Sequence, residues 1–128
     1  MGIEGFWTVR FASVAGESLQ SESAAVVIFS DGRLLGGDTW SYFVGTYGQA
    51  DDGSFNLKVH VRTHFTQNGE SIFGGPLVPY TLNGRADFDI QSNKLSAVLE
   101  VEGLEGARMV AIMRRVSDQE VKDLTTKE

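Results

Sequence analysis

The sequence predicts an all-β fold: one domain built as an antiparallel eight-stranded up-and-down β-barrel. The strongest observation is the alternation in FNLKVHVRTHF at residues 55–65, where apolar residues take one parity and polar residues the other. Since side chains along a strand point alternately to its two faces, this strand has one buried and one solvated face. Similar segments recur with short turns between them, which predicts sequential hairpins. A sheet of such strands loses its edges by closing into a barrel, and the short turns favour this architecture over a β-sandwich.

Five strands are expected in the first half of the chain. They cover residues 5–14, 24–30, 33–37, 39–49 and 55–65. Asp31-Gly32 and Asp52-Gly53 predict tight hairpin turns, because aspartate and glycine tolerate the positive φ that such turns need. The stretch AGESLQSES at residues 15–23 is polar, so it is expected to be a connection between strands.

Three strands are expected in the second half, followed by a polar C-terminal tail. They cover residues 80–90, 95–103 and 108–116. Residues 66–79 contain both prolines and are expected to form a loop or lid, because proline is excluded from central strands. Asn83-Gly84 predicts a bulge or sharp bend, and the spacing of Ser117 and Glu120 predicts a short capped helical turn. The barrel domain is therefore expected at residues 1–116 and the tail at residues 117–128.

The composition argues against several classes of function. The chain has no cysteine, which removes disulfides, thiolate metal ligands and thiol catalysis. Its net charge is −6 and its lysines and arginines are mostly scattered, so direct nucleic-acid binding is not expected. No segment resembles a secretory signal or a membrane span, and a cytoplasmic protein is expected. An acidic surface suits a basic protein partner.

No pattern of catalytic or metal-binding residues stands out, so no enzyme activity, metal or cofactor is expected. His60 and His64 share the polar face of one predicted strand, but at about 3.3 Å per residue they lie too far apart to bind one ion. At Gly36-Gly37-Asp38 the strand is expected to end in a sharp turn, with Asp38 bonding nearby amides. An enzyme whose polar residues come together from separate strands remains a third alternative.

Aromatic residues are numerous, and in a small barrel most of them are expected to fill the interior. The candidates for lining an internal cavity are Trp7, Phe11, Leu57, Val59 and Phe88. Residues 39–49 are aromatic on both parities, and a strand that is apolar on both faces is often covered on its outer side by another chain. The candidates for a dimer or partner interface are therefore Trp40, Tyr42, Phe43 and Tyr47.

Three motifs carry a resemblance to a known family. They are GFWTVRF at residues 5–11, VVIFSDGRLLGGD at 26–38 and YFVGTY at 42–47, followed by a short acidic turn and the long alternating strand. In order and spacing they resemble the GrlR-like family of negative regulators of type III secretion. The resemblance implies a lipocalin-like barrel, a homodimer and a bacterial regulator that sequesters a transcriptional activator. It also implies activator binding by an acidic loop, of which this chain carries half, Asp51 and Asp52.

Two functions stay open on these grounds. The first is a non-enzymatic regulator that binds a protein partner, with the acidic loop steering toward a basic surface. The alternative is a carrier or sensor of a small apolar ligand, enclosed in the barrel interior under the loop at residues 74–79.

Overall fold

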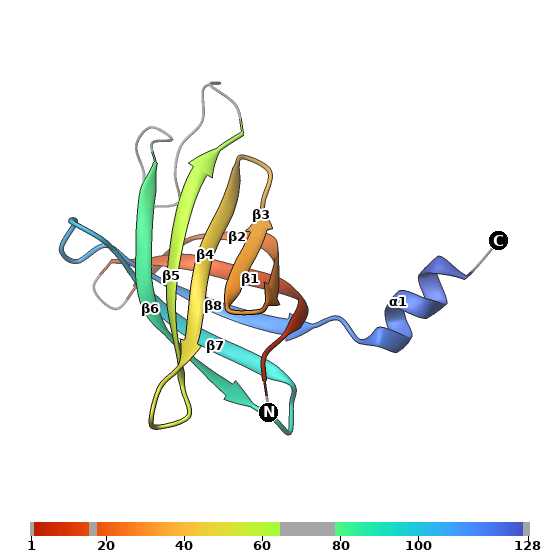
Figure 1. The fold of residues 1–128 in the computed structure, drawn as a ribbon. Coiled ribbons are helices and arrows are strands. Elements are labelled where there is room, and N and C mark those ends of the chain that lie inside the picture. Colours follow the sequence, from red (N-terminus) through yellow and green to blue (C-terminus); the bar gives the residue numbers. More distant parts are fainter. Residues whose placement is uncertain (1, 16–17, 65–78, 127–128) are drawn as a thin grey trace.

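The computed structural model describes residues 2–15, 18–64 and 79–126, and these residues form a closed antiparallel barrel with a short helix after it (Figure 1). The strands are β1 (Gly5–Ala15), β2 (Ser18–Ser30), β3 (Arg33–Gly37), β4 (Ser41–Gln49), β5 (Phe55–Thr63), β6 (Tyr80–Asp89), β7 (Lys94–Val101) and β8 (Arg108–Arg115), and the helix is α1 (Asp118–Thr125). Each strand pairs with the next one in sequence, and β8 pairs with β1 to close the sheet. The predicted eight-stranded antiparallel barrel is confirmed.

The alternation along β5 has the predicted structural meaning. Phe55, Leu57 and Val59 are buried, whereas Asn56 and Lys58 between them are exposed. The inward side chains of all eight strands join in one apolar core. Phe65, the last member of the predicted pattern, lies outside the described residues, as does all but the last residue of the loop expected at 66–79.

The two aspartate–glycine turns differ from each other. Asp31 and Gly32 both have positive φ, 52° and 79°, as a two-residue hairpin requires. At the second turn only Gly53 has positive φ, and its amide donates to the carbonyl of Ala50 at 3.0 Å. This is the geometry of a three-residue hairpin, in which a type I turn is followed by a left-handed glycine.

The polar segment at residues 15–23 is not a simple connection, because β2 begins at Ser18 and pairs with β1 as far as Ala15. The register shifts once, between Ala12 and Val14. Glu22 and the two residues after it are all exposed, so this part of β2 is solvated on both faces. A strand that is wet on both faces needs no apolar alternation, which explains why the sequence pattern missed it.

Asn83-Gly84 forms no bulge, because β6 keeps an unbroken register with both β5 and β7. The glycine is required by a close approach instead: a Cβ at Gly84 would lie 2.1 Å from the carbonyl oxygen of Val98. The same crowding occurs at Gly36 and Gly45, on β3 and β4. Inward-facing glycines of this kind let the strands of a small barrel bend sharply across one another.

The tail contains a complete short helix. The Ser117 hydroxyl accepts a hydrogen bond from the Glu120 amide at 3.0 Å, which confirms the predicted cap. Helix α1 continues for eight residues, longer than the single turn expected, and none of its residues is buried. It stands apart from the barrel beyond the end of β8 (Figure 1).

Candidate functional site

One end of the barrel is closed by aromatic side chains. Trp7 lies edge-on to Phe29 and Phe88, with ring centroids 6.2 and 6.0 Å apart, and Phe29 lies edge-on to Tyr47 at 5.1 Å. Trp7 is completely buried and Phe29 is nearly so. Edge-to-face pairs of this kind add stabilisation beyond the apolar area they bury. We call this cluster of Trp7, Phe29, Tyr47 and Phe88 the aromatic plug.

The N-terminal segment and Arg115 seal the aromatic plug. The indole N–H of Trp7 donates to the carbonyl of Ile3 at 2.9 Å, and the Ile3 side chain is completely buried. The guanidinium of Arg115 lies 4.7 Å from the centroid of the Trp7 ring and donates to the carbonyls of Glu4 and Gly2, at 2.8 and 3.1 Å. The positive charge over the indole and the two carbonyl contacts hold the segment before β1 across this end.

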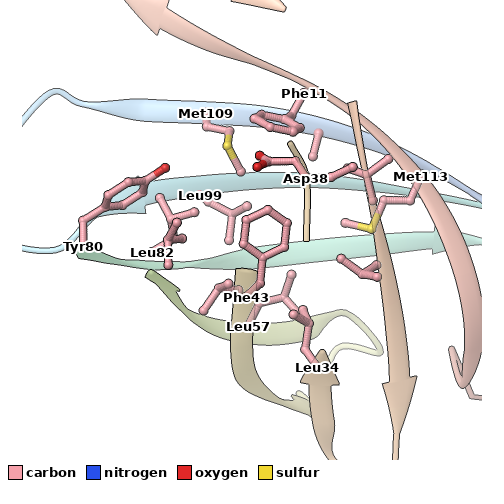
Figure 2. A pocket seen from close by; sticks show the side chains of 16 residues that line it. Phe11, Leu34, Asp38, Phe43, Leu57, Tyr80, Leu82, Leu99, Met109 and Met113 are labelled. Carbon is pink, nitrogen blue, oxygen red and sulfur yellow. The ribbon is translucent and has the colours of Figure 1, made fainter. Parts of the chain in front are cut away.

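The other half of the barrel encloses a cavity of about 60 Å³. Its wall is mostly aliphatic, with Phe11, Phe43 and two methionines, Met109 and Met113, among the lining residues (Figure 2). The volume is well below the roughly 300–1,000 Å³ of common small-molecule pockets. The cavity therefore suits a small or narrow apolar group.

The cavity-lining candidates divide between the two halves. Phe11, Leu57 and Val59 line the cavity. Trp7 and Phe88 are not among the lining residues of this cavity, because both belong to the aromatic plug. Parity alone places all five side chains inside the barrel, but it carries no information about how far along the barrel axis each one lies.

Two polar side chains reach the cavity wall, Asp38 after β3 and Tyr80 at the start of β6 (Figure 2). One carboxylate oxygen of Asp38, Oδ1, accepts hydrogen bonds from the backbone amides of Trp40 and Ser41, at 2.9 and 2.7 Å. This confirms the predicted bonding of Asp38 to nearby amides. Burial, and then the negative charge of Asp38, raises the pKa of Tyr80 to about 12, so its phenol is neutral at neutral pH. The sequence did not single out either residue as part of a cavity.

The interface candidates also divide. Tyr42 is exposed on the outer face of β4, and Trp40 is exposed in the bend before this strand, which begins at Ser41 rather than at residue 39. Phe43 and Tyr47 have the opposite parity and pack against the core, so their side chains are not on the outer face where a partner would bind. The candidates on the outer face are therefore Trp40 and Tyr42, and their contact with a partner stays a prediction.

An exposed apolar row crosses the outer face of four strands. Phe6 on β1 is paired with Ile28, Ile28 with Leu35, and Leu35 with Val44 on β4. Each of these four side chains is 39 to 48 % exposed, and we call the row the outer apolar stripe. Two more exposed apolar side chains lie beside the stripe, Val26 on β2 and Tyr42 on β4. Both are paired with Gly37 on β3, which lies between them. Only Tyr42 in this surface was an interface candidate from the sequence.

The acidic loop between β4 and β5 has two different carboxylates. Asp52 accepts hydrogen bonds from the amide and hydroxyl of Ser54, at 3.0 and 2.6 Å, and pairs with Arg85. The Ser54 bonds, with the contribution of Arg85, lower the pKa of Asp52 to about 2. Asp51 is exposed and makes no hydrogen bond or ion pair with the residues that the structure describes. Of the two candidates for partner binding, only Asp51 therefore presents an uncommitted charge.

The histidines make separate contacts. His60 Nδ1 lies 3.0 Å from the hydroxyl of Thr81, and His64 Nε2 lies 3.0 Å from the backbone carbonyl oxygen of Asp38. Across residues 2–15, 18–64 and 79–126, no three His, Asp or Glu side chains come together as a metal site would require. The described helix is too short and too polar to cross a membrane.

Comparison of the chain with protein-family models and with curated proteins returned no match.

Proposed function

We propose that this protein is a non-enzymatic regulator that acts by binding protein chains, and that the outer apolar stripe is where a second copy of the chain docks. The observation that carries this proposal is the stripe itself. Four neighbouring apolar side chains on four successive strands leave a contiguous patch in contact with water. Patches of this kind on a soluble protein commonly mark an interface with another chain.

The uncharged stripe is the surface on which two copies of this acidic chain can meet with least repulsion. Each chain carries a net charge of −6, so two copies repel one another over most of their surfaces. The stripe contains no charged residue, and its lateral neighbour on β5 is His60. Two stripes related by a two-fold axis would meet without opposing carboxylates, and such a self-complementary contact is the commonest way in which protein subunits associate.

The resemblance to GrlR-like regulators supports a transcriptional activator as the further partner. Asp51 is the residue best placed to attract a basic surface, because its carboxylate is exposed at the tip of the β4–β5 hairpin. Charges at the rim of an interface act mainly on the rate and specificity of association. Asp52 would instead keep the hairpin in shape through Ser54 and Arg85.

Sedimentation equilibrium of the purified chain tests the self-association. We expect a dimer for the parent and a monomer for Leu35→Glu, which places a carboxylate in the middle of the stripe. Val98→Glu is the matched control, because Val98 is also exposed on an outer face, at 50 %, but lies on β7 beside Arg85. A monomeric parent, or equal dissociation of both variants, contradicts the proposed interface.

The regulatory role has its own test. Tagged parent and Asp51→Asn proteins are used to capture binding proteins from the lysate of the natural host, and the captured proteins are identified by mass spectrometry. We expect a DNA-binding activator with the parent and less of it with Asp51→Asn. If the parent is dimeric but captures no activator, the regulatory role fails while the interface stands.

A further inference from the structure

We propose that the cavity binds a small organic cation, with its ammonium group at the carboxylate of Asp38 and its apolar part inside the barrel. This function is separate from protein binding on the outer face, because the two surfaces lie on opposite sides of the same strands. Leu34 and Leu35 illustrate the separation: Leu34 lines the cavity and Leu35 belongs to the outer apolar stripe.

The carboxylate of Asp38 has a fixed position. Asp38 follows β3 directly, and its Oδ1 is held by the amides of Trp40 and Ser41. A third bond within the same turn, from the Asp38 amide to the Ser41 carbonyl at 2.9 Å, restrains the backbone. The carboxylate is therefore ordered before any ligand arrives, which lowers the entropy lost on binding.

The carboxylate of Asp38 has no counter-ion among the residues that the structure describes. Asp38 Oδ2 makes no hydrogen bond, and the carboxylate no ion pair, with the residues described at 2–15, 18–64 and 79–126. The contact of His64 with Asp38 is made to the backbone carbonyl oxygen, at 3.0 Å. Residues 65–78, between β5 and β6, include no lysine or arginine. A carboxylate beside an apolar wall gains most from a ligand that brings a positive charge.

The rest of the cavity wall is almost entirely apolar. Among the described lining residues other than Asp38, only Tyr80 has a strong hydrogen-bonding side chain, and its neutral phenol oxygen can accept a bond from an ammonium N–H. All other lining residues are apolar, and they extend as far as Leu57, whose neighbour on β4 is Tyr47 of the aromatic plug. A ligand with one charged end and one short apolar chain matches this arrangement. An anion would be repelled by the carboxylate of Asp38. A bare metal ion would make no contact with the apolar wall.

The size of the cavity limits the apolar part of the ligand. At about 60 Å³ it is smaller than the engineered apolar cavities of roughly 150 Å³ that hold benzene, so a short unbranched chain is the better match. Phe43 reaches into the space from β4 (Figure 2). The methionines Met109 and Met113 in the wall are unbranched and can adjust to the shape of a guest.

Butylammonium, n-butanol and butyrate share one chain and differ in the polar end, so together they test the proposal. Binding is followed by the shifts of backbone amide signals in NMR titrations of the full chain. We expect butylammonium to bind the parent at least about tenfold more tightly than n-butanol, the difference expected for a charged hydrogen bond, and butyrate not to bind. Equal affinities for butylammonium and n-butanol overturn the proposal, as does binding of butyrate.

Asp38→Asn is the first variant, because the amide oxygen can still accept from Trp40 and Ser41 while the charge is lost. We expect its affinity for butylammonium to fall by about tenfold or more. Asp87→Asn makes the same change of net charge at an exposed position of β6 that does not line the cavity, and it should bind as the parent does. An equal loss in both variants means that the cation is attracted only by the overall charge, and overturns the proposal.

Two further measurements keep the test decisive if Asp38→Asn does not fold. In the parent, nuclear Overhauser effects should place the methylene next to nitrogen near Tyr80 and the terminal methyl near Leu57; the reverse orientation overturns the proposal. Phe43→Ala enlarges the cavity and should bind hexylammonium more tightly than the parent does. If neither the parent nor Phe43→Ala binds any of the ammonium compounds, the cavity is not a ligand site and the proposal fails.

Discussion

The two halves of the barrel are built from the same strands and filled in different ways. At one end the inward residues are large aromatics, and the segment before β1 crosses them under the guanidinium of Arg115. At the other end the inward residues are mainly aliphatic, and a carboxylate lies at the wall of a cavity. Both halves have the same alternation of apolar and polar residues. The difference in how they are filled therefore comes from the size of the inward side chains and from the segments that cover each end. An eight-stranded barrel is close to the size at which side chains just fill it, and small changes in side-chain volume decide between a plug and a cavity.

A row of small side chains marks the boundary between the two halves. Phe11 on β1 is paired with Ala111, Ala111 with Ala97, Ala97 with Ala86, and Ala86 with Phe55 on β5. The row therefore places three small side chains between two large ones. Alternation of small and large residues around one level of a barrel is how its interior is filled without strain.

The largest effect is expected at the aromatic plug. Trp7→Ala removes a completely buried side chain with two aromatic neighbours, and we expect it to lower the free energy of unfolding by about 3–5 kcal/mol. Chemical denaturation followed by circular dichroism measures this change. Trp40→Ala is the control, because Trp40 is 41 % exposed, and it should cost less than about 1 kcal/mol. Equal costs would mean that the plug does not hold this end together.

The next effect concerns the seal over the plug. Arg115→Met keeps much of the side-chain volume but loses the charge over Trp7 and both bonds to backbone carbonyls, and we expect a loss of about 2–3 kcal/mol. Arg114→Met is the control. Arg114 is exposed, and its one ion pair in the described residues, with Glu120, is long at 4.0 Å and therefore weak. This variant should cost below about 1 kcal/mol in the same denaturation experiment. Similar losses in both variants would contradict the assigned role of Arg115.

The plugged half and the half with the cavity should differ in how much an added side-chain volume destabilises the fold. Ala86→Val adds two methyl groups at a completely buried position away from the cavity, and overpacking should cost about 1–3 kcal/mol. Ala111→Val adds the same groups at the cavity wall, where there is space, and should cost less than about 1 kcal/mol. The difference between the two melting temperatures measures how hollow the second half is in solution. If Ala111→Val is the more damaging variant, the cavity is absent in solution.

The smallest effect is expected on the surface, as a change in pH dependence. Asp52 has a pKa of about 2 in the folded chain, below its ordinary value of 3.8. Since its folded pKa is lowered, Asp52 stabilises the fold fully above pH 4 or so, and this contribution is lost as the pH falls through about 2. Asp52→Asn should therefore show a shallower fall in melting temperature between these pH values. Asp51→Asn is the control for the change of net charge, and identical curves for all three proteins would contradict the prediction.

The candidate sites were less predictable than the fold, and the reason is visible in particular residues. Tyr42 and Phe43 are adjacent aromatics, and the sequence treated both as interface candidates. Because they have opposite parity, one lies on the outer face and the other lines the cavity. The outer apolar stripe was missed because its four members come from four strands, so no local pattern contains them. Asp38 was predicted to bond to nearby amides, but its place at the cavity wall follows only from closure of the barrel.

The sequence by itself determined the class of the fold, the order of the strands, the β2–β3 hairpin turn and the cap of the C-terminal helix. These features depend on period-two alternation, on residues that accept positive φ and on one hydroxyl three residues before an amide, all of which act over a few neighbouring positions. Only the tertiary structure decided where β2 begins, why Gly84 is needed, which inward residues meet at the plug and which ones leave a cavity. These outcomes depend on the register and depth of strands that are distant in the sequence. Register and depth exist only once the sheet has closed.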